Sequence, residues 1–239
     1  MKCAAVVAAL AMALSLASCG EDDDDDNSGS GTEDYSITTA PTITSITAGT
    51  ELNTVVVNWT AATSPSASIQ YKVYFTETDN ASAEAIGSLS PLETSSTLLL
   101  PSLAISAAEQ KTYYFFVKAT NGWAESNALH SEKTSASKSY TATIQPFPVP
   151  TNVKKTATVG ECTVTWDAVD GATGYFIYEL SGDYDISNGK WALNLLKTVD
   201  APATTATVTV SQTKIYVKAL KDKNGVFNTS EYALATLSN

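Results

Sequence analysis

The sequence predicts an all-β protein in which one pattern of strands occurs twice. Short runs of β-branched and aromatic residues alternate with polar ones, and Pro, Gly, Ser, Asn and Asp separate the runs. This pattern is typical of antiparallel strands joined by turns. No long apolar stripe of helical period interrupts the runs. Because the same order of runs then recurs at near-equal spacing, we expect two copies of one domain rather than one large barrel.

Residues 1–18 are typical of a secretory signal peptide. Lys2 provides a positive start, and the apolar run 4–17 is shorter than the roughly 20 residues that span a bilayer. The residues Leu16-Ala17-Ser18-Cys19 resemble the lipobox of bacterial lipoproteins, in which the cysteine is acylated and the preceding peptide is removed. The resemblance implies a lipid anchor at Cys19, with each buried CH₂ contributing about 0.8 kcal/mol to membrane binding.

The segment after Cys19 is strongly acidic. Residues 20–34 read GEDDDDDNSGSGTED, and such a segment cannot bury enough surface to offset its ordering entropy. We expect residues 19–38 to be the lipidated cysteine and a disordered tether, because adjacent aspartates in a floppy chain make a poor Ca²⁺ cage. Acidic residues at this place resemble surface-export signals of bacterial lipoproteins. The resemblance implies a lipid-anchored protein of the bacterial cell envelope, at the outer membrane and exposed on the cell surface.

Alternating runs mark the strands of each copy. In the first copy, the residues expected to face the core are Val55, Val57 and Trp59, then Tyr71, Val73 and Phe75, then Tyr113, Phe115, Val117 and Ala119. In the second copy they are Cys162, Val164 and Trp166, then Tyr175 and Ile177, then Ile215, Val217 and Ala219. Cys162 is therefore expected to be buried. Prolines at 146, 148 and 150 favour an extended connector between the copies.

These runs carry a family resemblance. The segments VVVNW (55–59), YKVYF (71–75) and YYFFVKATNG (113–122) resemble a fibronectin type III domain, as do CTVTW (162–166), GATGYFIY (171–178) and IYVKAL (215–220). The resemblance implies two tandem immunoglobulin-like β-sandwiches of seven strands and about 100 residues each. Leu103 and Tyr113 match the leucine and the corner tyrosine of the family, whereas Thr213 replaces that tyrosine in the second copy. The corner hydrogen bond is therefore not expected in the second copy.

The predicted organisation follows from these segments. It comprises a lipoprotein signal peptide at 1–18, the lipidated cysteine and tether at 19–38, a first fibronectin type III-like domain at 39–144 and a second at 145–239.

The residue types argue against catalysis and against cofactor or metal binding. His130 is the single histidine and is expected at an exposed edge, so a small hydrolase using His130 is a remote alternative. No arginine is present to clamp a phosphate or a carboxylate. The segment from Asp183 and Asp185 to Gly189 has alternate oxygen groups like a Ca²⁺ loop, but position twelve is Asn194 rather than Glu. We interpret it as a solvated hairpin loop.

Side chains alternate along a strand, so the residues between the core positions are expected to face outward. This places aromatic rings on one exposed sheet of each copy, and aromatic residues also follow the glycine of each last hairpin loop. The predicted binding surface consists of Tyr74, Tyr114, Phe116, Phe176, Tyr178 and Tyr216 on the sheets, with Trp123 and Phe227 in the loops. The alternative is that these rings only support strand pairing or are covered by loops.

The function expected from the sequence is that of a non-catalytic protein, anchored by lipid in the envelope, that binds an extracellular protein or glycan in adhesion or capture. A structural spacer without a ligand is the main alternative. The net charge of −11 argues against nucleic acid as a partner, because nucleic acids bind to clustered basic residues.

Overall fold

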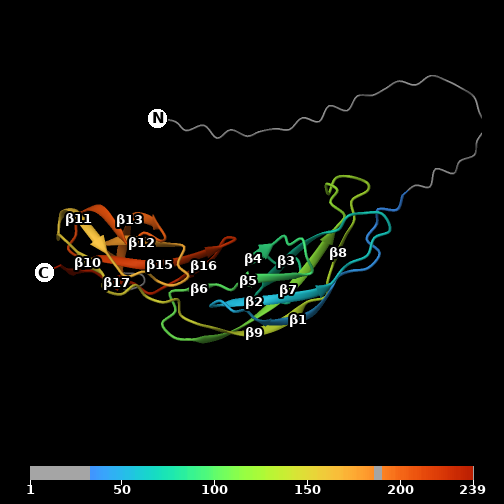
Figure 1. Ribbon diagram of the computed structural model, residues 1–239, viewed down its shortest axis with the longest axis horizontal. Helices are drawn as coiled ribbons and strands as arrows, with labels where there is room; N and C mark the ends of the chain where they lie inside the picture. The colour runs from blue at the N-terminus through green and yellow to red at the C-terminus, as the bar shows by residue number, and fades with distance from the viewer. Residues whose placement is uncertain (1–32, 186–189, 239) are drawn as a thin grey trace, which may run out of the picture. The chain divides into compact units, whose positions relative to one another are not determined.

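The computed structural model describes residues 33–185 and 190–238, without the side chains of 182–191 (Figure 1). All regular secondary structure in the described residues is β-strand, so the all-β prediction is confirmed. Accordingly, the described residues include no helix long and apolar enough to cross a membrane. Residues Glu33–Asn239 form one compact unit.

The first half of this unit is a sandwich of two antiparallel sheets, which we call the first sandwich. One sheet has the order β1-β2-β5, and the other has β4-β3-β7 with β8 and β9 paired in succession along β7. The strands are β1 (Thr42–Ala48), β2 (Thr54–Thr60), β3 (Gln70–Thr76), β4 (Gly87–Leu89), β5 (Ser95–Leu99), β7 (Glu109–Thr120), β8 (Glu132–Thr134) and β9 (Lys138–Ile144). Since β8 and β9 share one edge, the sandwich has the seven strand positions that the resemblance implies.

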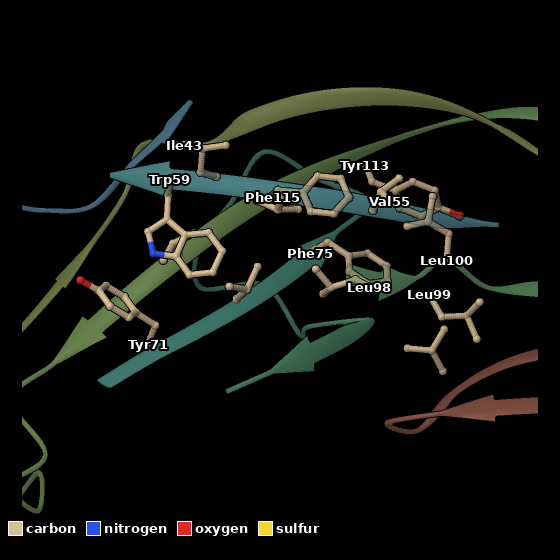
Figure 2. Close-up of a cluster of buried hydrophobic side chains, with 14 of the residues drawn as sticks. Ile43, Val55, Trp59, Tyr71, Phe75, Leu98, Leu99, Leu100, Tyr113 and Phe115 are labelled. Atoms are coloured by element: carbon tan, nitrogen blue, oxygen red, sulfur yellow. The ribbon is translucent and has the colours of Figure 1, made fainter. Parts of the chain in front are cut away.

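The interior of the first sandwich is built from alternate residues of strands in both sheets. Val55 and Trp59 from β2 meet Phe75 from β3 and Phe115 from β7 in one buried cluster (Figure 2). The rings of Phe75 and Phe115 lie 5.5 Å apart. All ten core positions predicted for this copy are buried, because the pleat directs every second side chain to the same side of its sheet.

The second sandwich repeats this arrangement. One sheet has the order β14-β11-β10-β18, and the other contains β13-β12-β15 with β16 and β17 paired in succession along β15. The strands are β10 (Lys154–Lys155), β11 (Gly160–Thr165), β12 (Gly174–Asp185), β13 (Lys190–Asp200), β14 (Thr205–Val210), β15 (Ile215–Lys223), β16 (Val226–Thr229), β17 (Ala233–Leu234) and β18 (Thr236–Leu237). Cys162 is free and fully buried here, as predicted.

The same aromatic pair organises both interiors. The rings of Trp59 and Tyr71 lie 5.7 Å apart, and the Tyr71 hydroxyl accepts a hydrogen bond of 2.9 Å from a backbone N–H in the loop before β3. Trp166 and Tyr175 lie 5.1 Å apart, with an equivalent bond of 2.9 Å. Since Trp59 and Trp166 belong to different clusters, the prediction of two separate interiors is confirmed.

The two sandwiches close their ends differently. In the first, the hydroxyl of buried Tyr113 has no hydrogen-bond partner in the described structure, and Leu103 is 63% exposed. The corner contact that the resemblance implies for this pair is therefore absent. In the second, the buried Glu179 carboxylate accepts bonds from the backbone N–H groups of Ser211 (2.8 Å) and Gln212 (3.1 Å). This carboxylate holds the turn where a corner tyrosine is missing.

The predicted tether extends too far towards the first sandwich. Ile37 is 2% exposed and packs in the first core, and the Thr38 N–H donates a 2.7 Å bond to the carbonyl of Thr63. The prediction that residues 35–38 are disordered is wrong because Ile37 fills the interior between loops, a contact that no local pattern reveals.

Backbone pairing and side-chain packing connect the two sandwiches. The short strand β6 (Ser102–Leu103), which follows β5, pairs in parallel with β16. Val226 of β16 is 4% exposed and belongs to the core cluster of the first sandwich. In return, Leu52 of the first sandwich packs against the core of the second. Each core is therefore completed by a residue of the other sandwich.

Polar contacts accompany this packing. The Asn53 side chain donates to the Gln145 carbonyl and accepts from its N–H, both at 2.8 Å. The Lys221 ammonium, which is largely covered, pairs at 2.7 Å with the exposed carboxylate of Glu51. This hydrogen bond to Lys221, together with the charge of Lys223, lowers the pKa of Glu51.

Truncating Val226 tests this connection. Val226→Ala removes methyl groups from the first core, so we expect the free energy of unfolding to fall by about 1–3 kcal/mol. Phe227→Ala, at the adjacent and 42% exposed position, is the control, with an expected change within about 0.5 kcal/mol. Urea unfolding followed by circular dichroism measures both. Equal effects of the two substitutions would show that Val226 does not complete the first core.

Candidate functional site

The rings predicted for the exposed sheet of the first sandwich are mostly covered. Tyr74 and Phe116 are 6% and 3% exposed, and their rings stack at 5.3 Å with an angle of 17° between planes. The Tyr74 hydroxyl donates a 2.9 Å hydrogen bond to the carbonyl of Ala81 in the loop between β3 and β4. The prediction that Tyr74 and Phe116 face solvent is wrong because this loop folds back over them. Tyr114 remains half-buried.

The aromatic rings predicted for the sheet of the second sandwich are partly exposed. Phe176 and Tyr178 on β12 and Tyr216 on β15 are half-buried, as the alternation places them, and Tyr178 lies directly opposite Tyr216. Tyr232, in the connection between β16 and β17, is 41% exposed. Its ring meets those of Tyr178 and Tyr216 edge-on, at 5.6 Å and 6.2 Å. These rings form one continuous cluster.

Leucines extend this cluster across the sheet. Leu195 of β13 lies opposite Tyr178, and Leu234 of β17 lies opposite Tyr216. The two leucines are 52% and 50% exposed. We call this surface the aromatic face, and it comprises Phe176, Tyr178, Leu195, Tyr216, Tyr232 and Leu234.

Sequence reasoning missed half of the aromatic face. Alternation along β13 does not predict that Leu195 lies beside Tyr178, because the register between β12 and β13 shifts next to Tyr178. Tyr232 lies outside the strands, so no period of two applies to it. Leu234 belongs to a two-residue strand, which is too short to show alternation.

Two charged residues, Lys218 and Glu231, lie beside the aromatic face. Lys218 lies beside the rings, and its ammonium nitrogen is 4.8 Å from the centre of the Tyr232 ring. Burial lowers the pKa of Lys218, and the nearby Glu231 opposes this effect. Burial also raises the pKa of Tyr178 and of Tyr232, so both hydroxyls stay neutral well above pH 7.

The aromatic rings differ in exposure between the two sandwiches because the chain leaves β3 and β12 in different ways. In the first, β3 ends at Thr76 and ten residues lead to β4, enough to form a loop that covers Tyr74. In the second, β12 and β13 are 12 and 11 residues long and pair as one extended hairpin. Within the described residues, this hairpin provides no connection over β12 comparable to the loop between β3 and β4, and the rings beside β12 stay partly exposed.

The loop aromatics Trp123 and Phe227 are each 42% exposed. Trp123 contacts the ring of Tyr35 edge-on at 6.0 Å, at the end of the first sandwich. Phe227 lies on β16, opposite Asp222. The structure therefore places neither residue in the aromatic face.

His130 is held by contacts on both ring nitrogens rather than lying free at an edge. Nδ1 lies 2.9 Å from the Trp123 carbonyl oxygen, and Nε2 lies 3.6 Å from the Glu132 carboxylate. Hydrogen bonds from Lys118, and more weakly from His130, lower the pKa of Glu132. No described serine or cysteine makes a hydrogen bond to this imidazole, so the geometry provides no nucleophile–base pair.

Two predicted features lie outside the described residues. These are Cys19 and residues 186–189 of the predicted hairpin loop. The prediction that residues 183–185 belong to that loop is wrong, because they continue β12 and pair with β13; their side chains are not described. Among the residues that are described, no three His, Cys, Asp or Glu side chains gather into a possible metal site.

Comparisons with known proteins find similar solved structures but no matching family. No protein family model and no curated protein matches the chain. Among solved structures, the FN1–FN3 domains of chicken CNTN1 are similar at 15% identity, over 83% of this chain and 67% of that one, with a TM-score of 0.31. A segment of two fibronectin type III domains from chicken tenascin is similar at 15% identity, over 81% and 96%, with a TM-score of 0.30. These similarities are weak over the full length, and the fold class rests on the strands and sheets described above.

Stability measurements separate the covered rings from the aromatic face. Phe116→Ala leaves a cavity against Tyr74, so we expect it to lower the free energy of unfolding by about 3–5 kcal/mol. Tyr178→Ala, at a half-exposed position of the second sandwich, is expected to lower it by about 1 kcal/mol. Denaturant unfolding measures both. A smaller loss for Phe116→Ala than for Tyr178→Ala would contradict the burial of the first pair.

Proposed function

We propose that this chain is a non-catalytic lipoprotein of the bacterial cell envelope that binds an extracellular protein through the aromatic face. The observation that supports it best is the row of partly exposed side chains Leu195, Tyr178, Tyr216 and Leu234, which crosses four strands in one register. Residues of this kind scattered singly are ordinary, whereas a continuous row is a feature of interaction sites.

The composition of the aromatic face supports a protein partner. Tyrosine is enriched among the residues that dominate protein interfaces, and the cores of interfaces are depleted in charge. Tyr178, Tyr216 and Tyr232 supply rigid apolar area with a polar tip, and Lys218 is the cation at their edge. The face is part of a sheet, whose rigid backbone costs little entropy when a partner binds.

The ring geometry argues against a glycan on this face. Tyr232 meets Tyr178 and Tyr216 at angles of 83° and 74°, and Phe176 meets Tyr178 at 63°. Since the rings of each pair are steeply inclined to one another, they do not form a flat platform of parallel ring faces. Sugar rings stack on such parallel faces, so a protein surface suits this arrangement better.

The family and the location of the chain belong to the same proposal. The resemblance of both halves to fibronectin type III domains, with two packed sheets in each, supports two such domains, divided near residue 145 between β9 and β10. The lipobox-like residues ending at Cys19 and the acidic segment after them support anchoring at the outer membrane with display on the cell surface. A hydrolase using His130 receives no support, since its ring nitrogens contact the Trp123 carbonyl and the Glu132 carboxylate and no described serine or cysteine.

Substitution of Cys19 tests the anchor. Without the thiol no acyl chain is attached, so the full chain with Cys19→Ala, expressed in a Gram-negative bacterium, is expected to leave the membrane fraction. Fractionation after metabolic labelling with an alkynyl fatty acid measures both the label and the location. Ser18→Thr, which keeps the cysteine, is the control. A Cys19→Ala protein that stays in the membrane fraction would contradict lipid anchoring.

Binding through the aromatic face is tested with residues 33–239 on an array of extracellular and matrix proteins. We expect at least one protein of the array to bind saturably. The double substitution Tyr178→Ala with Leu195→Ala should lower its affinity by about thirtyfold, equivalent to about 2 kcal/mol. Leu92→Ala is the matched control, because Leu92 is fully exposed on the first sandwich. Equal binding of the two variants would contradict the proposed face. An array without any partner would favour the spacer alternative.

A further inference from the structure

We propose a second binding site, for a neutral sugar, in a hollow at one end of the first sandwich. This site is separate from the aromatic face and does not rest on the function proposed for it. The hollow has a volume of about 360 Å³, within the range of small-ligand sites. The residues that line it are Tyr35, Ser66, Ala67, Ser68, Gln70, Asn121, Gly122 and Trp123.

Three segments that are distant in sequence build the hollow. They are the residues before β1, the loop between β2 and β3, and the loop between β7 and β8, which meet at the same end of the sandwich (Figure 1). The Ile37 N–H donates a 3.0 Å bond to the Ser131 hydroxyl, and the Asn121 amide donates a 3.2 Å bond to the Tyr35 carbonyl. These cross-links hold the walls in place before any ligand arrives.

Trp123 is the aromatic platform of the site. Its indole is 42% exposed, and the ring of Tyr35 supports it edge-on at an angle of 76°. Its backbone is fixed from both sides, since its N–H donates to the Asn121 side-chain oxygen at 3.3 Å and its carbonyl lies 2.9 Å from His130 Nδ1. His130 is therefore a positioning residue for Trp123. An aromatic ring held ready in this way binds without a large entropic cost.

The polar lining has free hydrogen-bonding capacity. Ser66, Ser68 and Gln70 are exposed, and their side chains make no hydrogen bond to other described residues. The two serine hydroxyls can each donate and accept hydrogen bonds. The Gln70 amide donates through its NH₂ group and accepts through its oxygen. Gly122 has φ = +78°, and a Cβ built there would lie 3.5 Å from the Gln70 amide, so the backbone passes close to that side chain.

The chemistry of this lining selects a neutral sugar. No lysine or carboxylate lines the hollow, so an ionic ligand would find no opposite charge. A purely apolar ligand would leave the hydroxyl and amide groups without partners, which is unfavourable. A hexopyranose has an apolar C–H face for the indole and a rim of hydroxyls for Ser66, Ser68 and Gln70.

The site is tested by titrating residues 33–239 with neutral hexasaccharides of glucose, xylose and mannose. The chain contains four tryptophans, and ¹⁵N NMR follows the single indole N–H of each. We expect at least one sugar to shift the Trp123 signal saturably, while the signals of buried Trp59 and Trp166 stay in place and report an intact fold. The expected result is a dissociation constant in the millimolar range or below.

Variants locate the site. Titration calorimetry measures the variants without the indole signal. Trp123→Ala should weaken sugar binding at least about tenfold, and Ser68→Ala with Gln70→Ala should also weaken it while Trp123 stays in place. Phe227→Ala is the matched control, since Phe227 has the same exposed fraction but lies on β16 of the second sandwich, and it should leave the affinity unchanged. Absence of a saturable shift with every sugar would overturn the proposal. So would binding that survives Trp123→Ala, or shifts caused by neutral peptides and by no sugar.

Discussion

The alternation of side chains along each strand is the constraint on which this structure depends. In both sandwiches it brings a tryptophan from one sheet against a tyrosine from the other, and the tyrosine hydroxyl then holds the loop before its own strand. A shift of one residue in the register would expose these rings and bury their polar neighbours. The same rule that fills the interiors also decides which side chains are left for the outside.

What covers the outer side is decided by connections rather than by strands. The loop after β3 crosses the sheet of the first sandwich and buries Tyr74, whereas Tyr178 on β12 stays half-exposed. Two copies of one pattern thus differ in the surface they offer. The aromatic face and the Trp123 hollow lie on different sandwiches, so the two proposed binding sites are separate surfaces of one chain.

The two sandwiches are joined by shared core residues and by backbone pairing. Val226 completes the core of one sandwich and Leu52 packs on that of the other, while β6 and β16 share backbone hydrogen bonds. Exchange of core residues differs from the polar, sliding contacts common between domains of one chain.

The sequence alone determined the strands, the ten core positions of the first copy and the burial of Cys162, because a period of two is a local property that each strand carries in its own residues. It also supplied Phe176, Tyr178 and Tyr216, which follow from the same period. Only the tertiary structure decided that Tyr74 and Phe116 are covered, that Ile37 belongs to a core, and that Tyr232, Leu195 and Leu234 complete one face. Those outcomes depend on loop paths, a register shift and contacts between distant segments, and no residue pattern within one strand records them.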